Sequence, residues 1–139
     1  MVHALGEIRR VLVPFGTLVD LRPLADRWPV EILKRDVPIE TGRMQDLPTG
    51  LADDQAANDA IEEATRCNWY HQISEITFPL YMYWDDPDEM IAYLFERWAD
   101  FVQMDDQTLE LTRAAWVDAG KNKRVRLKLK MLLTIWQKT

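Results

Sequence analysis

The stretch EIRRVLVPFGTLVDLRP, residues 7–23, decides how the rest of the chain is interpreted. It predicts the end of a helix, a tight turn at Pro14 and Gly16, and a strand that begins at Thr17. The segment TLVDL, residues 17–21, shows no alternation of polar and apolar residues, which is typical of a strand covered on both faces inside a parallel sheet. The few residues before it cannot supply neighbouring strands, so we expect its partners to come from elsewhere.

The length and composition predict a single globular domain over residues 1–139. A chain of this length buries roughly 65–70% of its unfolded surface when it folds. Hydrophobic residues make up 47% of the chain, but the mean hydropathy is -0.29 and no long apolar run indicates a membrane span. The N-terminal residues lack the basic and apolar regions of a secretory signal. We therefore expect a cytoplasmic protein that does not enter a membrane.

Charge is distributed unevenly along the chain, which bears on nucleic-acid binding. The formal net charge is -6, yet residues 51–119 carry three basic and sixteen acidic side chains, and residues 120–139 carry seven basic and no acidic ones. The basic residues between Lys121 and Lys130 could contact phosphates, or they could form the solvent-facing side of an amphipathic strand. Because an acidic body repels a polyanion, we favour the strand interpretation over nucleic-acid binding.

Periodicity and capping signals predict about four helices and about five strands. Asp86 has the character of an N-cap, followed by proline at the first helical position and glutamate at the third, and Asp105 marks a further helix start, with Gly120 as its stop. These signals favour one domain of mixed α and β elements.

In the last strand the apolar residues alternate with basic ones, which are Val125, Leu127, Leu129, Met131, Leu133 and Ile135 against Arg126, Lys128 and Lys130. A strand inside a parallel sheet is covered on both faces, so these basic residues favour a mixed α/β to α+β fold with a largely antiparallel sheet and helices mostly on one face. The expected helices are 3–12, 52–68, and those that start at Asp86 and Asp105; the expected strands are 17–21, a hairpin of 30–36 with 38–47, 69–84 and 124–138.

No group of residues predicts a catalytic or metal-binding site. Ser74 is the only serine, and its surroundings do not resemble a nucleophile elbow. Cys67 is the only cysteine; it could pair with His71 as a nucleophile, but packing on a helix is the interpretation we favour. The chain cannot form an internal disulfide, and its two histidines do not complete a metal set with one cysteine.

The opening stretch is similar to a segment of class I S-adenosylmethionine-dependent methyltransferases. In that family a helix like EIRRVLVP leads through a proline-glycine turn into the fifth strand of the sheet, here GTLVDL. The resemblance continues in order through FPLYMYWDDPDEM, residues 78–90, and the final strand RVRLKLKMLLTIW, residues 124–136. It is greatest to bacterial methyltransferase-like proteins of unassigned substrate, and it implies that residues 3–139 correspond to the C-terminal half of the fold.

The chain departs from this family in its glycines. The family carries two glycines after the proline, whereas Phe15 takes the first of these places and leaves only Gly16. The family binds its cofactor with a glycine-rich turn after the first strand and an acidic residue at the end of the second, and no two glycines here form a GxG. The resemblance therefore implies no cofactor-binding residue and no cofactor for the isolated chain; S-adenosylmethionine would bind only if the missing half were supplied.

The resemblance also implies an open strand edge. In the family the fifth strand lies between the fourth and the seventh, so without the fourth strand Thr17–Leu21 would present an unpaired apolar edge. A second copy of the chain in a homodimer, the inserted hairpin, or a complementing polypeptide could cover this edge.

We therefore expect a methyltransferase-like module without its own cofactor site, which is not an enzyme as an isolated chain and which forms homodimers or binds a partner or substrate. The alternative is the substrate-binding half of a methyltransferase, with the N-terminal half supplied in trans or lost by truncation. A stand-alone binding module with a Trp- and Tyr-rich surface is a third hypothesis. Loop salt bridges and core aromatics are the competing explanation for the residues that would form a substrate wall, which are Arg22, Asp26, Arg27, Trp28, Tyr81 and Tyr83.

Overall fold

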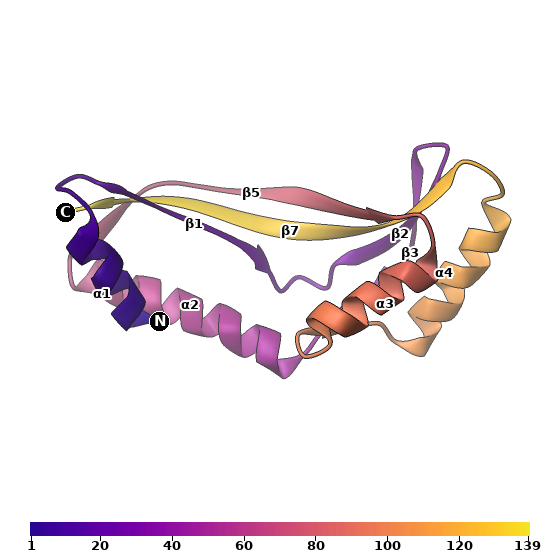
Figure 1. The fold of residues 1–139 in the computed structure, drawn as a ribbon, viewed down its shortest axis with the longest axis horizontal. Helices are drawn as coiled ribbons and strands as arrows, with labels where there is room; N and C mark the ends of the chain where they lie inside the picture. Colours follow the sequence, from indigo (N-terminus) through magenta and orange to yellow (C-terminus); the bar gives the residue numbers. More distant parts are fainter. The chain divides into compact units, whose positions relative to one another are not determined.

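The computed structural model describes all residues from Met1 to Thr139. The chain forms a mixed α+β fold with four helices, a five-stranded, mostly antiparallel sheet and a separate two-stranded sheet (Figure 1). This confirms the predicted mixed class and the number of helices. The elements in chain order are α1 (Val2–Val11), β1 (Thr17–Leu24), β2 (Pro29–Lys34), β3 (Val37–Arg43), β4 (Gln45–Asp46), α2 (Pro48–Arg66), β5 (Tyr70–Trp84), α3 (Pro87–Trp98), β6 (Val102–Gln103), α4 (Asp106–Asp118) and β7 (Lys123–Lys138).

Strand β7 organises the five-stranded sheet. The strand order is β1-β7-β2-β3, and β5 also pairs with β7. Strand β2 runs antiparallel to β7, with Val30 opposite Leu127 and Lys34 opposite Lys123. Strand β1 is antiparallel to β7 as well, because Lys138 at the end of β7 donates its backbone N–H to the carbonyl of Gly16, just before β1 begins.

The chain divides into two compact units, which are described separately. Unit 1 consists of Met1–Leu24, Ala52–Phe78 and Met131–Thr139. Unit 2 consists of Ala25–Leu51 and Pro79–Lys130. Strands β5 and β7 contribute residues to both units.

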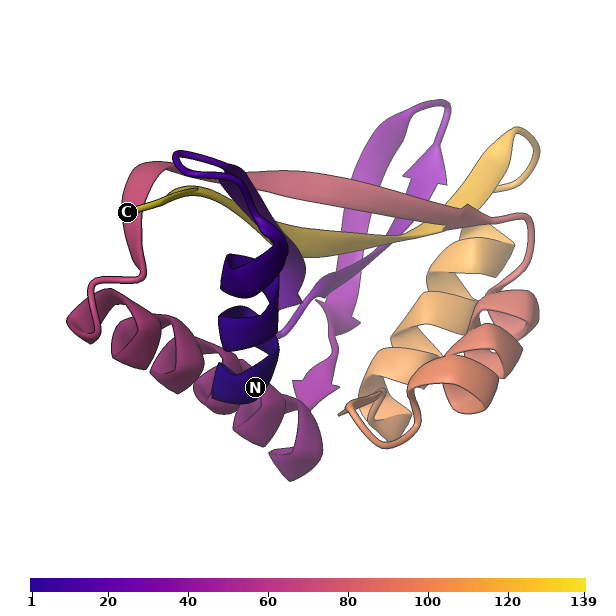
Figure 2. The ribbon, with the colours of Figure 1, turned by 60° about the vertical axis from the view of Figure 1, so that its left-hand side comes forward.

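Unit 1 has a small core under one side of its strands. Helices α1 and α2 lie on the same side of β1, β5 and β7 (Figure 2). The hydroxyl of Tyr70 donates to the carbonyl of Leu5 at 2.8 Å, which ties β5 to α1. Little apolar surface is fully buried here, so hydrophobic stabilisation of this unit is limited. The buried cluster is Ala64, Tyr70 and Trp136, with Leu5, Leu12, Leu18, Ile61 and Trp69 packed around it.

Unit 2 has a larger core between its strands and helices α3 and α4. Three threonines tie α4 to the hairpin of β2 and β3. The Oγ1 atoms of Thr41 and Thr112 lie 2.8 Å apart, and Thr112 Oγ1 also donates to the carbonyl of Thr108 at 2.7 Å. Such buried hydroxyls are stable only when they are hydrogen-bonded, so they fix how α4 sits on the hairpin. The buried apolar side chains include Val30, Ile32, Met44, Met90, Leu94, Val102, Val125, Leu127 and Leu129.

Several predicted boundaries are confirmed. Asp86 is the N-cap of α3 and accepts a hydrogen bond from the backbone N–H of Asp88 at 2.7 Å. Asp105 caps α4 in the same way through the N–H of Thr108, and these hydrogen bonds hold the pKa of the Asp105 carboxyl below its usual value. Gly120 follows α4 with a φ of 69°, as expected of a helix stop. The predicted hairpin is also present, with β2 and β3 paired antiparallel.

Two expectations about burial are wrong. The TLVDL segment is not covered on both faces: in β1 the side chains alternate, and Val19 and Leu21 are each 55% exposed. Helices cover only one face of β1, and an apolar sequence does not itself supply a cover for the other. The alternation expected in β7 also shifts: Thr134 and Trp136 are buried in place of Leu133 and Ile135, so the buried face changes phase after Met131.

We predict that Gly42→Ala destabilises the protein by about 1–3 kcal/mol, because a methyl group at Gly42 would overlap the buried side chain of Thr108. Gly6→Ala is the matched control. A methyl group there meets only ordinary contacts with the Trp69 ring at 3.5 Å, and removing a glycine from α1 should stabilise the helix. Urea unfolding measures both changes, and equal midpoints for the two variants would contradict this account of the interface between β3 and α4.

Candidate functional site

Unit 1 presents an open strand edge and an uncovered apolar face. Strand β1 ends the strand order, so it pairs with β7 on one side and with no strand on the other. Because Gly16 bonds to β7, alternation turns the backbone N–H and C=O groups of Thr17, Val19 and Leu21 toward the open edge. The side chains of Val19 and Leu21 are more than half exposed, and so are those of Ile73 and Ile76 on β5.

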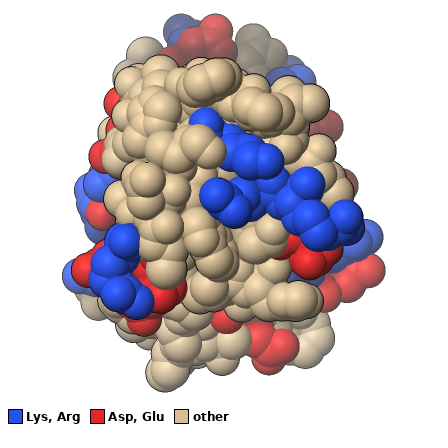
Figure 3. All heavy atoms as spheres, turned by 90° about the vertical axis from the view of Figure 1, so that its left-hand side faces the viewer, with Lys and Arg blue, Asp and Glu red and all other residues tan.

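The surface at the end of unit 1 is mostly uncharged. Figure 3 turns toward the reader the side of the molecule that lies at the left of Figure 1, where α1 leads into β1. Uncharged atoms cover most of this face, and a group of Lys and Arg atoms crosses it. The segment that joins α1 to β1 is itself apolar and exposed, with Val11, Val13 and Phe15 all more than 60% accessible.

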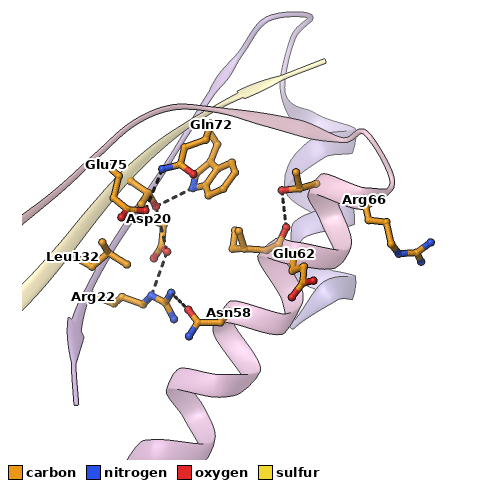
Figure 4. A pocket seen from close by; sticks show the side chains of 12 residues that line it. Asp20, Arg22, Asn58, Glu62, Arg66, Gln72, Glu75 and Leu132 are labelled. Atoms are coloured by element: carbon orange, nitrogen blue, oxygen red, sulfur yellow. Dashed lines mark hydrogen bonds and ion pairs between the residues drawn. The ribbon is translucent and has the colours of Figure 1, made fainter. Parts of the chain in front are cut away.

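An open cavity of about 490 Å³ lies between α2 and the strands of unit 1 (Figure 4). Arg22, one of the predicted substrate-wall residues, lies in it. Its guanidinium donates to Asn58 Oδ1 of α2 at 2.6 Å and lies 3.3 Å from a carboxylate oxygen of Asp20. The complete lining is Asp20, Arg22, Asn58, Ile61, Glu62, Thr65, Arg66, Gln72, Glu75, Leu132, Thr134 and Trp136.

Three other predicted wall residues, Asp26, Arg27 and Trp28, take structural positions in unit 2. The carboxylate of Asp26 pairs with Lys130 at 3.4 Å. Arg27 adopts a φ of 47°, and its backbone N–H donates to Asp46 at 3.0 Å. Trp28 is buried and meets Trp98 edge to face, with ring centroids 5.6 Å apart.

The remaining predicted residues, Tyr81 and Tyr83, lie beside Arg126 in unit 2. The guanidinium of Arg126 stands over the Tyr81 ring at 4.4 Å and forms an ion pair with Glu31. Burial lowers the pKa of Arg126, but hydrogen bonds with Glu31 and Tyr83 outweigh it, so the net pKa is raised and the side chain stays charged. Tyr81 therefore packs against a buried ion pair, and Tyr83, which is 46% exposed, contacts the same arginine through its hydroxyl.

The basic residues near the start of β7 are largely engaged within the protein. Arg124 lies 3.6 Å from Asp85, and Lys123 lies over the ring of Trp116 at 4.2 Å. Lys130 and Arg126 pair with acids as described above. This pairing favours the interpretation of these residues as one side of an amphipathic strand.

The other chemical candidates show no features of a site. The thiol of Cys67 donates to the Glu63 carboxylate at 3.3 Å, and this hydrogen bond is the main reason that the thiol pKa is raised. A raised pKa disfavours the thiolate that a nucleophile needs. No group of three or more His, Cys, Asp or Glu side chains is placed to hold a metal ion. None of the four helices has the length and apolar character needed to cross a membrane.

Sequence reasoning missed most of the cavity. Asp20 is a single acid within an apolar strand, and Arg22 follows it at strand spacing, so the two could have been placed on one face. The positions of Thr134 and Trp136 in the cavity lining could not have been predicted, because the alternation of buried residues in β7 shifts before them.

Comparison with protein-family models, curated proteins and solved structures finds no match to this chain.

We predict that Arg126→Met lowers the free energy of unfolding by about 3 kcal/mol, because it leaves the Glu31 carboxylate without its partner. The side chains of Glu31 and Arg126 are only 10% and 14% exposed, so water cannot replace the lost contact easily. Adding Glu31→Leu should restore much of this loss, because it removes the unpaired charge.

Arg97→Met is the control, since Arg97 and Glu96 form an exposed pair at 3.8 Å. Its effect should stay within about 0.5 kcal/mol. If chemical denaturation shows equal losses for Arg126→Met and the Glu31→Leu double variant, the ion pair does not have the role assigned to it.

Proposed function

We propose that this chain is a cytoplasmic, methyltransferase-like module that has no cofactor site of its own and associates as a homodimer through the open edge of β1. The observation that supports the proposal most is the state of β1: an end strand with free backbone groups at Thr17, Val19 and Leu21 and two apolar side chains in solvent. Protein strands with these properties tend to pair with other strands.

The order of the strands supports the methyltransferase-like part of the proposal. The resemblance places the fifth strand of that family beside the seventh, and here β1 pairs with β7. The resemblance also places a fourth strand on the other side, and that side of β1 is open. The fold carries its helices on one side of the strands within unit 1, which agrees with the arrangement that we expected (Figure 1).

The first part of β1 lacks the devices that usually protect edge strands. Between Thr17 and Leu21 there is no lysine, no proline and no charged side chain turned to solvent, and a proline, Pro23, occurs only near the end of the strand. The edge strand β3 differs, since it carries Pro38 and an ion pair of Glu40 with Arg43 at 2.8 Å. Strand β5 contains Pro79 and several exposed polar side chains. The least protected stretch of these edges is thus Thr17–Leu21 of β1.

The sequence of β1 is suited to pairing with a second copy of itself. An antiparallel pair with a twofold axis at Val19 would place Val19 opposite Val19 and Thr17 opposite Leu21, on the apolar face. On the other face Asp20 would lie opposite Leu18, so no like charges meet. A register centred on Asp20 would bring two carboxylates together, and this disfavours it.

We predict that light scattering finds a species of about twice 16.3 kDa and that Val19→Lys shifts it to the single-chain mass, because lysine disrupts edge pairing. Val117→Lys is the matched control, since Val117 is 75% exposed on α4 in unit 2. It should leave the dimer intact. A wild-type protein that stays at 16.3 kDa at high concentration would refute the dimer, and so would equal dissociation by both variants.

The proposal that the chain has no cofactor site of its own rests on where the glycines lie. Gly6 and Gly50 are inside helices, Gly42 is inside β3, and Gly120 ends α4. Gly16 precedes β1. None of them forms a glycine-rich turn from a strand into a helix, which is what allows a backbone to approach such a cofactor closely.

We therefore predict that calorimetric titration of the isolated chain with S-adenosylmethionine gives no binding heat at micromolar concentrations. Saturable micromolar binding would instead favour the alternative in which the chain is part of a methyltransferase. The test is independent of the mass measurement, so the two parts of the proposal can fail separately.

A further inference from the structure

Helices α3 and α4 border an apolar groove in unit 2, and the two helices lie side by side in Figure 1 and Figure 2. Arg113 of α4 pairs with Asp88 of α3 at 2.8 Å, which links the helices. The groove has a volume of about 320 Å³, and Met44, Leu94 and Val102 in its wall are buried core residues. We call it the α3–α4 groove; its lining is Met44, Ile91, Leu94, Phe95, Ala99, Val102, Gln103, Met104 and Leu109.

The α3–α4 groove is apolar, and part of its wall is in solvent. Gln103 is its one polar lining residue, and the side-chain amide of Gln103 already donates to Gln45 Oε1 at 2.9 Å. The Phe95 side chain is 80% exposed, one helical turn after Ile91 on the same face of α3. A phenylalanine in solvent beside buried apolar residues indicates a docking surface for apolar side chains rather than a site for a polar ligand.

The helices around the groove are strongly acidic. Residues 85–119, which include α3 and α4, carry ten acidic and two basic side chains. The two arginines already pair with acids of these helices, Arg113 with Asp88 and Arg97 with Glu96. The excess of negative charge is therefore not compensated by bases of the same helices.

On α4 this negative charge lies next to the groove. Asp106 precedes the lining residue Leu109 by one helical turn, Glu110 follows it directly, and both acids are exposed. Asp105 is tied to the lining through Gln45, whose side chain donates to Asp105 at 3.2 Å and accepts from the lining residue Gln103. An apolar groove with acids beside it is complementary to a surface that combines apolar and basic side chains.

We propose that the α3–α4 groove binds a basic amphipathic helix of a partner protein. Apolar side chains spaced three and four residues apart on such a helix would lie against Phe95, and its lysines or arginines would lie near Asp106 and Glu110. Acidic proteins and anionic lipid surfaces are disfavoured because they would meet like charge. A second copy is disfavoured because α1, the helix of this chain with a net positive charge, already packs Leu5 against the core of unit 1.

The test uses the lysine–leucine peptide KLKKLLKKLKKLLK, whose leucines share one face when it is helical. One control has glutamate at every lysine position, and the other has the same composition with the leucines spread around the helix. Binding is followed by the methyl resonances of the methionines: those of Met44 and Met104 should shift, and that of Met131 in unit 1 should not. Both controls should bind at least about tenfold more weakly, because one lacks the charge match and the other the apolar face.

A first pair of variants tests the apolar contact. Phe95→Ser should weaken binding of the lysine–leucine peptide by about tenfold or more, because it removes the exposed apolar anchor. Val117→Ser is the matched control, since Val117 is also exposed in unit 2 but does not line the groove. It should leave binding unchanged.

A second pair separates docking in the groove from general attraction to an acidic protein. Asp106→Asn combined with Glu110→Gln should weaken binding by about threefold or more. Asp53→Asn combined with Glu62→Gln removes the same charge from α2 in unit 1 and should leave binding unchanged.

The proposal would be overturned by equal shifts of Met131 and Met104, by equal binding of the glutamate peptide, by no weakening in Phe95→Ser, or by equal weakening in the two double variants. A lower mass of Phe95→Ser than of the wild type in light scattering would assign the groove to a second copy and would overturn it as well. The variant that tests the dimer, Val19→Lys, should leave peptide binding unchanged, so the two proposals can fail separately.

Discussion

The sheet depends on one strand, β7, which is the only strand that pairs with three others. Its first half pairs with β2, and its last residues bond to the segment that leads into β1. Alternate residues of β7 enter the core of unit 2 at Val125, Leu127 and Leu129, and the core of unit 1 at Thr134 and Trp136. A slip of one residue in β7 would turn all of these side chains to the opposite face, so the register of this strand constrains both units at once.

The two halves of β7 differ in the side chains on their second face, which is the face opposite the buried core residues. In unit 2 the second face carries Arg126, which is closed off by Glu31 and the Tyr81 ring. In unit 1 the second face carries Leu133 and Ile135, which are only partly buried, beside the exposed Val19 of β1. A charged side chain with its partner is satisfied within the unit, whereas an apolar side chain left in water is not. Along β7, the contrast leaves apolar side chains available for association in unit 1 and satisfied charges in unit 2.

The sequence predicts the local features of this fold well because their causes are local. An aspartate at an N-cap, a proline at the first helical position or a glycine after a helix acts through neighbouring backbone atoms, and Asp86, Asp105 and Gly120 all act as predicted. The burial of β1 was predicted wrongly because an apolar run indicates only that a strand can be covered. Whether a second layer exists depends on packing between distant segments, which is not encoded in those five residues.

The candidate site shows the same limit. Arg22 was selected as a residue of a substrate wall, and it does line a cavity, but Asn58 and Trp136 join it from segments 36 and 114 residues away. Their convergence depends on how α2 packs and on the change of phase in β7, and neither is visible in a local pattern. Contacts between residues that are far apart in the chain are the feature of a fold that is hardest to predict from a single sequence.

Strand β1 carries two charged side chains beside Leu18 on its inner face and two apolar side chains on its outer face. Asp20 and Arg22 face helix α2 and the interior of unit 1, whereas Val19 and Leu21 face solvent. A strand that belonged to a self-sufficient layer would place the apolar residues inside and the charged ones outside, because burying unused charge costs free energy. This pattern can be stable when the inner charges satisfy one another and the outer apolar residues meet another surface. The first condition is met by the contact of Asp20 with Arg22, and the second is what association through β1 would supply.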